Sequence, residues 1–114
     1  MLPEDRIRIG HMMEAAERAL AFVAGRTRDD MGNDDMLPLA LARAIEILGE
    51  AAAHVSAETR EVSPAVPWRQ IIGMRNRLVH AYLDVDTEIL WTTVTERLPE
   101  LVRALRALLA TENC

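Results

Sequence analysis

Hydrophobic residues recur at spacings of three and four along almost the whole chain, and no segment alternates as a β-strand would. Pro3, followed by two acidic residues, suits a first helical turn, and the spacing predicts a helix that ends near Gly25. A second helix is predicted from about Met36 to His54. Its apolar seam consists of Leu37, Leu41, Ala44, Leu48, Ala51 and Val55.

Polar and proline-containing segments separate the predicted helices. Residues 26–35 predict an acidic, solvated loop in which Asp34 or Asp35 caps the second helix. One short helical turn is expected near residues 57–60. A third helix is predicted from Pro67 to about Leu83, because proline is tolerated in a first helical turn.

The last predicted helix begins near Thr87, after a turn at Asp84 to Asp86 that offers a cap. Pro99 interrupts this helix, because proline lacks the backbone N–H and clashes with the preceding turn. A kink or short break is therefore expected near Arg97. The pattern predicts an all-α protein, a single domain over residues 1–114, built as an antiparallel four-helix bundle.

Two features of the first two helices predict how their surfaces are used. Small residues around Gly49 should let a neighbouring backbone approach closely. Apolar residues off the main seam make the stripes look wider than a monomeric bundle needs, which favours a homodimer. These residues are Ile7, Met12, Phe22 and Ile45.

Composition and charge narrow the class of protein. Half of the 114 residues are hydrophobic and the net charge is -5, which argues against tight, indiscriminate binding of nucleic acid. The lone Cys114 excludes an intramolecular disulfide and fits a reducing compartment. No signal peptide or membrane span is apparent in the sequence, so we expect a cytoplasmic protein.

One segment departs from the overall acidity. From Val62 to Leu83 the chain carries Arg69, Arg75 and Arg77 and no acidic residue. Within it, Asn76 and His80 are four residues apart and share a helical face, so the amide can orient the imidazole. Arg75 and His80 are five apart, about 140° around the helix axis.

These residue types suit metal-free cleavage of RNA. A neutral imidazole can accept the proton of a 2′-hydroxyl or donate one to the leaving oxygen, and a guanidinium can neutralise charge that develops on the phosphorane. The spacing alone also fits a solvated polar stripe that contains an ordinary histidine. Both interpretations stay open at this point.

Several blocks in order resemble the HepT-like family of the HEPN superfamily. The blocks run from Arg43 to Ala51, from Pro67 to Asn76 and from Leu78 to Tyr82, with further similarity at Asp84 to Asp86 and at Leu98 and Pro99. The resemblance spans residues 5–110. It implies a helical ribonuclease toxin of a toxin–antitoxin pair, active as a homodimer and without a metal or cofactor.

The resemblance also implies roles for individual residues. Arg75 and His80 match the family's catalytic Arg-x4-His signature, and Asn76 matches its polar residue after the arginine. Arg77, next in the cationic segment, is expected to be a further supporting residue. Tyr82 matches the tyrosine to which a partner nucleotidyltransferase antitoxin transfers AMP. The alternative interpretation is that the Tyr82 ring packs against the helical bundle. The alternative function is a non-catalytic, nucleotide-binding accessory subunit of such a nucleotidyltransferase. A third hypothesis is that the protein is a structural dimerisation module without catalytic function.

Other candidate residues have simpler interpretations. Glu50 is expected to reach across to orient Arg75, and Arg43 and Glu46 to form a helix pair. His54 and Glu58 show a four-residue spacing but lack further ligands, so no metal site is predicted. His11 is interpreted as a surface residue and Trp68 as a packing anchor rather than a base-stacking residue.

Overall fold

The computed structural model describes residues 1–80 and 86–111, with residues 78–80 described by their backbone alone. Within this part of the chain every regular element is a helix and no strand occurs, so the all-α prediction is confirmed. The elements in chain order are α1 (Pro3–Val23), α2 (Asp30–Asn33), α3 (Met36–Ala53), α4 (Ala57–Glu61), α5 (Trp68–His80), α6 (Thr87–Thr92), the π-helical segment η2 (Thr93–Arg97) and α7 (Leu98–Thr111).

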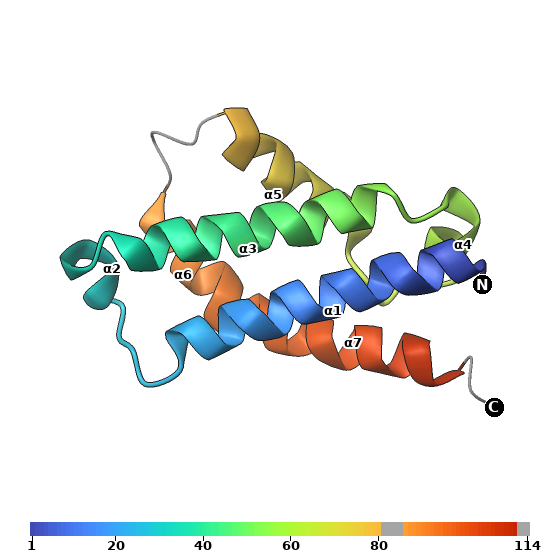
Figure 1. The fold of residues 1–114 in the computed structure, drawn as a ribbon, viewed down its shortest axis with the longest axis horizontal. Helices are drawn as coiled ribbons and strands as arrows, with labels where there is room; N and C mark the ends of the chain where they lie inside the picture. Colours follow the sequence, from blue (N-terminus) through green and yellow to red (C-terminus); the bar gives the residue numbers. More distant parts are fainter. Residues whose placement is uncertain (81–85, 112–114) are drawn as a thin grey trace.

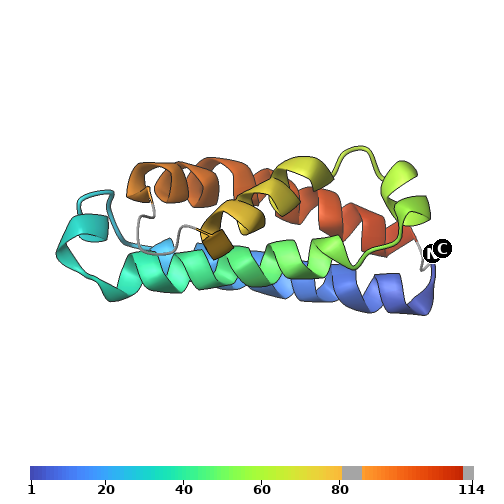
Figure 2. The same cartoon turned by 90° about the horizontal axis from the view of Figure 1, so that it is seen from above.

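The long helices form two layers (Figure 2). In one layer α1 and α3 lie side by side and run in opposite directions, and in the other lie α5 and the continuous α6–η2–α7 segment (Figure 1). α5 packs against α3, whereas α7 packs against α1. The described ends of the chain meet at one end of the molecule (Figure 1).

The core lies between the two layers. All six residues of the predicted seam on α3 are buried, which confirms that prediction. The interpretation of Met12 and Ile45 as surplus surface was wrong, because they are only 0% and 2% exposed. α1 packs against both α3 and α7, and α3 packs against both α1 and α5, so each needs a wide apolar stripe. Ile7 and Phe22 remain exposed, at 58% and 38%.

Helix boundaries follow local capping chemistry. α1 ends before Gly25, whose φ of 74° is a left-handed conformation that suits glycine after a helix. The side chain of Asp34 accepts a hydrogen bond from the Met36 N–H at 3.0 Å, while Asp35 makes no capping bond, which decides between the two predicted caps. Asp86 caps α6 as predicted, accepting bonds from two backbone N–H groups.

The segment between α1 and α3 is more ordered than the predicted solvated loop. It contains the short helix α2, whose Met31 is buried. Arg26 bridges Asp30 and Asp34, with nitrogen–oxygen distances of 3.3 and 2.8 Å. Asp30 and Asp34 in the predicted acidic loop therefore stay partly exposed, with 34% and 39% of their side chains accessible, and are also paired with Arg26, whose guanidinium has several donors.

The last helix changes geometry where the proline was expected to disturb it. η2 immediately precedes α7, and the Leu98 N–H bonds to the carbonyl of Thr93, five residues back. Pro99 has no N–H to continue the α-helical pattern, and a π-helical turn accommodates this without ending the helix. The helix therefore changes its hydrogen-bonding pattern near Arg97, where a kink or short break was predicted, but it continues without a break.

A buried carboxylate joins α1 to α4. Asp5 is 2% exposed, and its oxygens accept bonds from the Ser56 N–H at 2.9 Å, the Ser56 hydroxyl at 2.6 Å and the Thr59 hydroxyl at 2.6 Å. Burial raises the pKa of Asp5, but these hydrogen bonds together hold the pKa below its ordinary value. The short predicted turn near residues 57–60 thus exists as α4 and anchors the start of the chain.

The crossing of α3 and α5 is unusually close at Gly49. A Cβ at this position would lie 2.1 Å from the Cβ and 2.8 Å from the Cγ of Arg75, and 3.2 Å from the carbonyl oxygen of Ile71. Only glycine fits there without displacing α5. The predicted close approach is confirmed, and it sets the position from which the Arg75 side chain begins.

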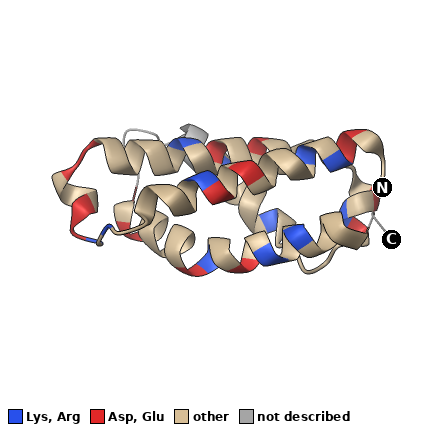
Figure 3. Ribbon diagram, turned by 60° about the horizontal axis from the view of Figure 1, so that its bottom comes forward, with Lys and Arg blue, Asp and Glu red and all other residues tan. Residues whose placement is uncertain are grey.

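Charged residues of both signs occur on neighbouring turns of the same helices (Figure 3). Some ion pairs join distant segments, such as Arg28 with Glu88 at 2.6 Å. Among the helices that the structure describes, none has the length and hydrophobicity needed to cross a membrane.

Candidate functional site

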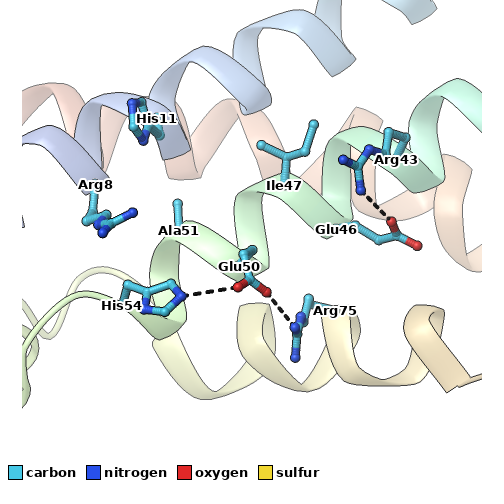
Figure 4. A pocket seen from close by; sticks show the side chains of 9 residues that line it. All are labelled: Arg8, His11, Arg43, Glu46, Ile47, Glu50, Ala51, His54 and Arg75. Atoms are coloured by element: carbon cyan, nitrogen blue, oxygen red, sulfur yellow. Dashed lines mark hydrogen bonds and ion pairs between the residues drawn. The ribbon is translucent and has the colours of Figure 1, made fainter.

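A polar groove of about 430 Å³ lies where α1, α3 and α5 meet, and we call it the first groove (Figure 4). Three helices contribute to it, so no single sequence segment defines it. Its lining consists of Arg8, His11, Arg43, Glu46, Ile47, Glu50, Ala51, His54 and Arg75.

Arg75 enters the first groove from α5 and is held at two points. Its Nη2 donates to Glu50 Oε2 at 2.5 Å, and its Nη1 donates to Asn76 Oδ1 at 2.8 Å. The predicted orientation of Arg75 by Glu50 is therefore present. Two of the five N–H groups of the guanidinium are used, so the others remain available for an anion.

Glu50 connects Arg75 with a histidine of its own helix. His54 Nε2 lies 3.1 Å from Glu50 Oε1, and because a carboxylate only accepts, this nitrogen must carry the hydrogen. The hydrogen bond with His54, followed by the positive charge of Arg75, holds the pKa of Glu50 below its ordinary value. The ionised carboxylate is thus the state in which Glu50 positions Arg75.

The opposite wall of the first groove comes from α1. Arg8 and His11 are exposed and face the α3 side chains across the groove (Figure 4). Arg43 lies nearer the N-terminus of α3 than Glu50 does, and it pairs with Glu46 at a nitrogen–oxygen distance of 3.1 Å, as predicted. Arg8 makes no hydrogen bond or ion pair within the described residues, so it adds an uncompensated positive charge to the groove.

Three further predicted site residues are Arg77, His80 and Tyr82. Arg77 is exposed and lines a second groove on another side of α5. His80 is the last residue of α5, and its backbone is helical. Tyr82 lies outside the described residues, so its predicted role is not addressed by the fold. Arg75, Asn76 and Glu50 are the predicted residues that the structure brings together.

Two simpler interpretations can be compared with the structure. Trp68 is buried and donates its Nε1–H to the Ser63 carbonyl at 3.1 Å, so it is a packing anchor. His11 is exposed, as expected for a surface residue. Among the side chains that the structure describes, in residues 1–77 and 86–111, no group of three or more His, Cys, Asp or Glu could hold a metal ion.

Sequence reasoning missed Arg8 and did not connect His11 or His54 with the site. Arg8 and His11 are three residues apart on one helical face, which was a usable local signal. Their position opposite Glu50 depends on how α1 packs against α3, and no spacing within the sequence reveals that.

The arrangement can bind and polarise an anion. A guanidinium fixed by a carboxylate and an amide loses little conformational entropy when it binds a phosphate, and unpaired Arg8 adds attraction at the other wall. The fold and the first groove thus define a small all-α protein with a fixed guanidinium, that of Arg75, on a helix that ends in a histidine.

Comparison with known proteins identifies the family. Residues 12–108 match the family described as Ribonuclease HepT-like. The chain belongs to this family of ribonucleases, which confirms the resemblance noted in its sequence and the prediction of an RNA-cleaving enzyme at this level. No solved structure shows significant similarity to the chain.

Curated relatives agree with this assignment. The chain is 35% identical to "Putative RNase TTE0752" of Caldanaerobacter subterraneus subsp. tengcongensis, over 90% of this chain and 92% of the relative. It is 38% identical to "Probable ribonuclease HepT" of Thermococcus cleftensis, over 77% of this chain and 80% of that protein. It is 34% identical to "Putative RNase MJ1380" of Methanocaldococcus jannaschii, over 79% and 83% respectively.

Proposed function

We propose that this chain is an endoribonuclease that needs no metal, with Arg75 and His80 as its catalytic residues. The observation that carries the proposal is the fixed guanidinium of Arg75, which Glu50 and Asn76 hold at the first groove. His80 follows five residues later on the same helix, α5. Membership of the HepT-like ribonuclease family supports RNA as the substrate.

The reaction is an internal transesterification. The 2′-oxygen of a ribose forms a bond to the adjacent phosphorus as the bond to the 5′-oxygen of the next nucleotide breaks. Imidazole chemistry supplies the proton transfers, with the 2′-hydroxyl proton going to a base and the leaving 5′-oxygen receiving one. Arg75 stabilises the charge on the phosphorane oxygens, which is greatest in the transition state. The products are a 2′,3′-cyclic phosphate and a free 5′-hydroxyl.

A homodimer forms part of the proposal. Residues five apart on one helix are separated by about 7.5 Å along the axis and about 140° around it, so one copy alone does not place both groups on one face. A twofold pair could bring Arg75 of one copy towards His80 of the other. The exposed side chains of Ile7 and Phe22 on α1 are apolar surface that we propose such an interface to cover.

The biological role that we propose is that of a toxin held inactive by a partner nucleotidyltransferase, which transfers AMP to Tyr82. Tyr82 follows His80 by two residues in the sequence. An AMP group there would add bulk and a negatively charged phosphate beside the catalytic segment. Such a group could exclude substrate and pair with arginines.

Incubation of the purified protein with cellular RNA or tRNA in EDTA tests the nuclease proposal. We expect cleavage by the wild type, a loss of at least about 100-fold for His80→Ala and Arg75→Ala, and full activity for Arg103→Ala. Arg103 is an exposed residue of α7 outside both grooves. Identical RNA profiles for the wild type and His80→Ala would refute the proposal, and tight AMP binding without cleavage would favour the accessory-subunit alternative.

The toxin proposal has its own test in cells. Expression without the partner should arrest growth, and co-expression with the nucleotidyltransferase should restore it while adding AMP to the intact protein, detected by mass spectrometry. Tyr82→Phe should accept no AMP and stay toxic in the presence of the partner. Growth that is unaffected by the chain alone would contradict this role.

A further inference from the structure

A second groove, of about 710 Å³, lies between α5 and the junction of η2 with α7. Its floor is made by apolar side chains of the core, and its rim carries three arginines, Arg69, Arg77 and Arg97. The remaining lining residues are Ile45, Leu48, Pro67, Gln70, Ile71, Gly73, Met74, Thr93, Leu98 and Leu101. None of the described residues that line the second groove is acidic.

The groove exists because α5 has a packing partner on one side only. α5 packs against α3 and makes at most marginal contact with α6, η2 or α7 in the described part of the chain. Arg69, Gly73 and Arg77 are spaced four residues apart, so they follow one another along a single stripe of α5. A Cβ at Gly73 would meet no atom within 4 Å, which leaves the middle of this stripe open.

The charge of the groove contrasts with that of the protein. The chain has a net charge of -5, and arginines elsewhere pair with carboxylates, as Arg26 and Arg28 do. Arg69, Arg77 and Arg97 make no hydrogen bond or ion pair with any residue that the structure describes. Three unpaired cations around one apolar groove repel each other, and an anion bound between them would remove that repulsion.

We propose that the second groove binds the single-stranded part of the RNA substrate next to the cleaved phosphate. Neighbouring phosphates lie on Arg69, Arg77 and Arg97, and an unstacked base lies over the apolar floor. This inference rests on the proposed nuclease function, because it assigns the groove to the same substrate. The groove supplies affinity and register, whereas the chemistry stays with Arg75 and His80.

Three observations favour an RNA strand over a single phosphate. Arg69 and Arg77 are separated by about 12 Å along α5, a span that suits several linked phosphates. Guanidinium groups bind phosphate in two-point contacts and can stack on base faces. Position 80 is three residues beyond Arg77 on the same helix, so a strand on this stripe reaches the catalytic segment.

Fluorescence anisotropy with a labelled, mixed-sequence single-stranded RNA tests the inference, in a His80→Ala background that prevents cleavage. The variants combine Arg69→Gln, Arg77→Gln and Arg97→Gln. Each phosphate contact to a single strand contributes about 0.7 to the salt dependence of log K, so three contacts contribute about 2.1. Over a fourfold rise in salt the parent should lose about 20-fold more affinity than the triple variant. Arg103→Gln, which removes an unpaired α7 arginine outside both grooves, should keep the salt dependence of the parent.

A second variant separates the groove from total charge. Gly73→Glu places a carboxylate in open space on the Arg69–Arg77 stripe and should weaken RNA binding by at least about 10-fold at low salt. Ala107→Glu adds the same charge on an exposed face of α7 and should change binding less than about twofold. Thermal melting by circular dichroism checks that each variant folds.

The outcomes distinguish this inference from the nuclease proposal. Equal RNA affinity and salt dependence for the parent and the triple variant would overturn the inference, even if the wild type cleaves RNA. Binding that depends on the three arginines, in a protein that cleaves nothing, would support the inference and refute the nuclease proposal. Binding of an acidic amphipathic peptide through the same arginines, with no RNA binding, would also overturn the inference.

Discussion

Replacement of Gly49 by alanine tests the link between the crossing of α3 with α5 and the position of Arg75, the proposed catalytic arginine. The added Cβ would lie 2.1 Å from the Cβ of Arg75, whereas carbon atoms in contact are normally about 3.5–4.0 Å apart. α5 must therefore move away from α3 by about 1.5 Å at this point. The neighbouring contact with the backbone oxygen of Ile71, at 3.2 Å, leaves little room for the change to be absorbed by side chains alone.

The expected stability change is a difference of two opposing effects. Overpacking of this kind costs about 1–3 kcal/mol. Alanine in place of glycine inside a helix stabilises the folded state by about 1 kcal/mol, because alanine has the higher helix propensity. With the clash directed at a Cβ and a backbone atom, we expect the upper part of the range, a net loss of about 1–2 kcal/mol. For a domain of this size the melting temperature should fall by about 6 °C.

Gly73→Ala is the matched control, because it makes the same chemical change on the partner helix. A Cβ at Gly73 meets no atom within 4 Å, so the variant should gain about 1 kcal/mol and melt about 4 °C higher. Calorimetry of both variants measures the two shifts. The two melting-temperature shifts should have opposite signs, because the added Cβ clashes at Gly49 and meets open space at Gly73.

The same Gly49→Ala variant should also lose activity, because Arg75 begins at the displaced point of α5. A misplacement of about 1 Å costs on the order of 100-fold in rate. RNA cleavage in EDTA, well below the melting temperature, measures this loss. If Gly49→Ala melts as high as Gly73→Ala, the helix crossing is not as close as described and the reasoning fails.

Three further predictions concern single side chains. Asp5→Ala should lower the free energy of unfolding at neutral pH by about 3 kcal/mol, because buried donors lose a charged acceptor. The pKa of Asp5 is lower in the folded state, so its contribution to stability is complete above the unfolded pKa and disappears as the pH falls through the folded pKa. Denaturant titrations should show that the difference in unfolding free energy between wild type and Asp5→Ala shrinks in acid. A difference that does not change with pH would contradict this prediction. Glu50→Gln should slow RNA cleavage about tenfold, because Arg75 is then held less firmly. Glu14→Gln, which changes a carboxylate in an exposed ion pair of α1, should leave the rate unchanged. Equal cleavage rates for Glu50→Gln and the wild type would show that Glu50 does not position Arg75. Asp86→Ala should lower the melting temperature by about 4 °C through loss of the α6 cap, and an unchanged melting curve would refute this.

Local sequence rules predicted the elements well. Helix boundaries, the seam on α3, the cap at Asp86 and the interruption before Pro99 depend on neighbours within a few residues, where periodicity and capping chemistry operate. The predicted loop before α3 was wrong in part, because Arg26 and its two aspartates organise it over distances of four and eight residues. The interpretation of Met12 and Ile45 as surface failed because their partners are on other helices.

The candidate site was predictable only in part. The proposed catalytic pair of Arg75 and His80 follows from the family resemblance, and the expected contact of Glu50 with Arg75 is present in the structure. Arg8, His11 and the unpaired arginines of the second groove could not be assigned, because their roles depend on which helix lies opposite and on where α5 leaves a gap.

By itself the sequence determined that this protein is helical, where α1, α3, α5 and α6 begin, and which segment resembles the ribonuclease family's motif. These properties depend on backbone hydrogen bonding and side-chain spacing over one or two helical turns. Only the tertiary structure decided that Gly49 brings α3 against Arg75, that α1 supplies the other wall of the first groove, and that Arg77 belongs to a different groove from Arg75. These relations depend on the packing of segments about 20 to 70 residues apart, which no local pattern encodes.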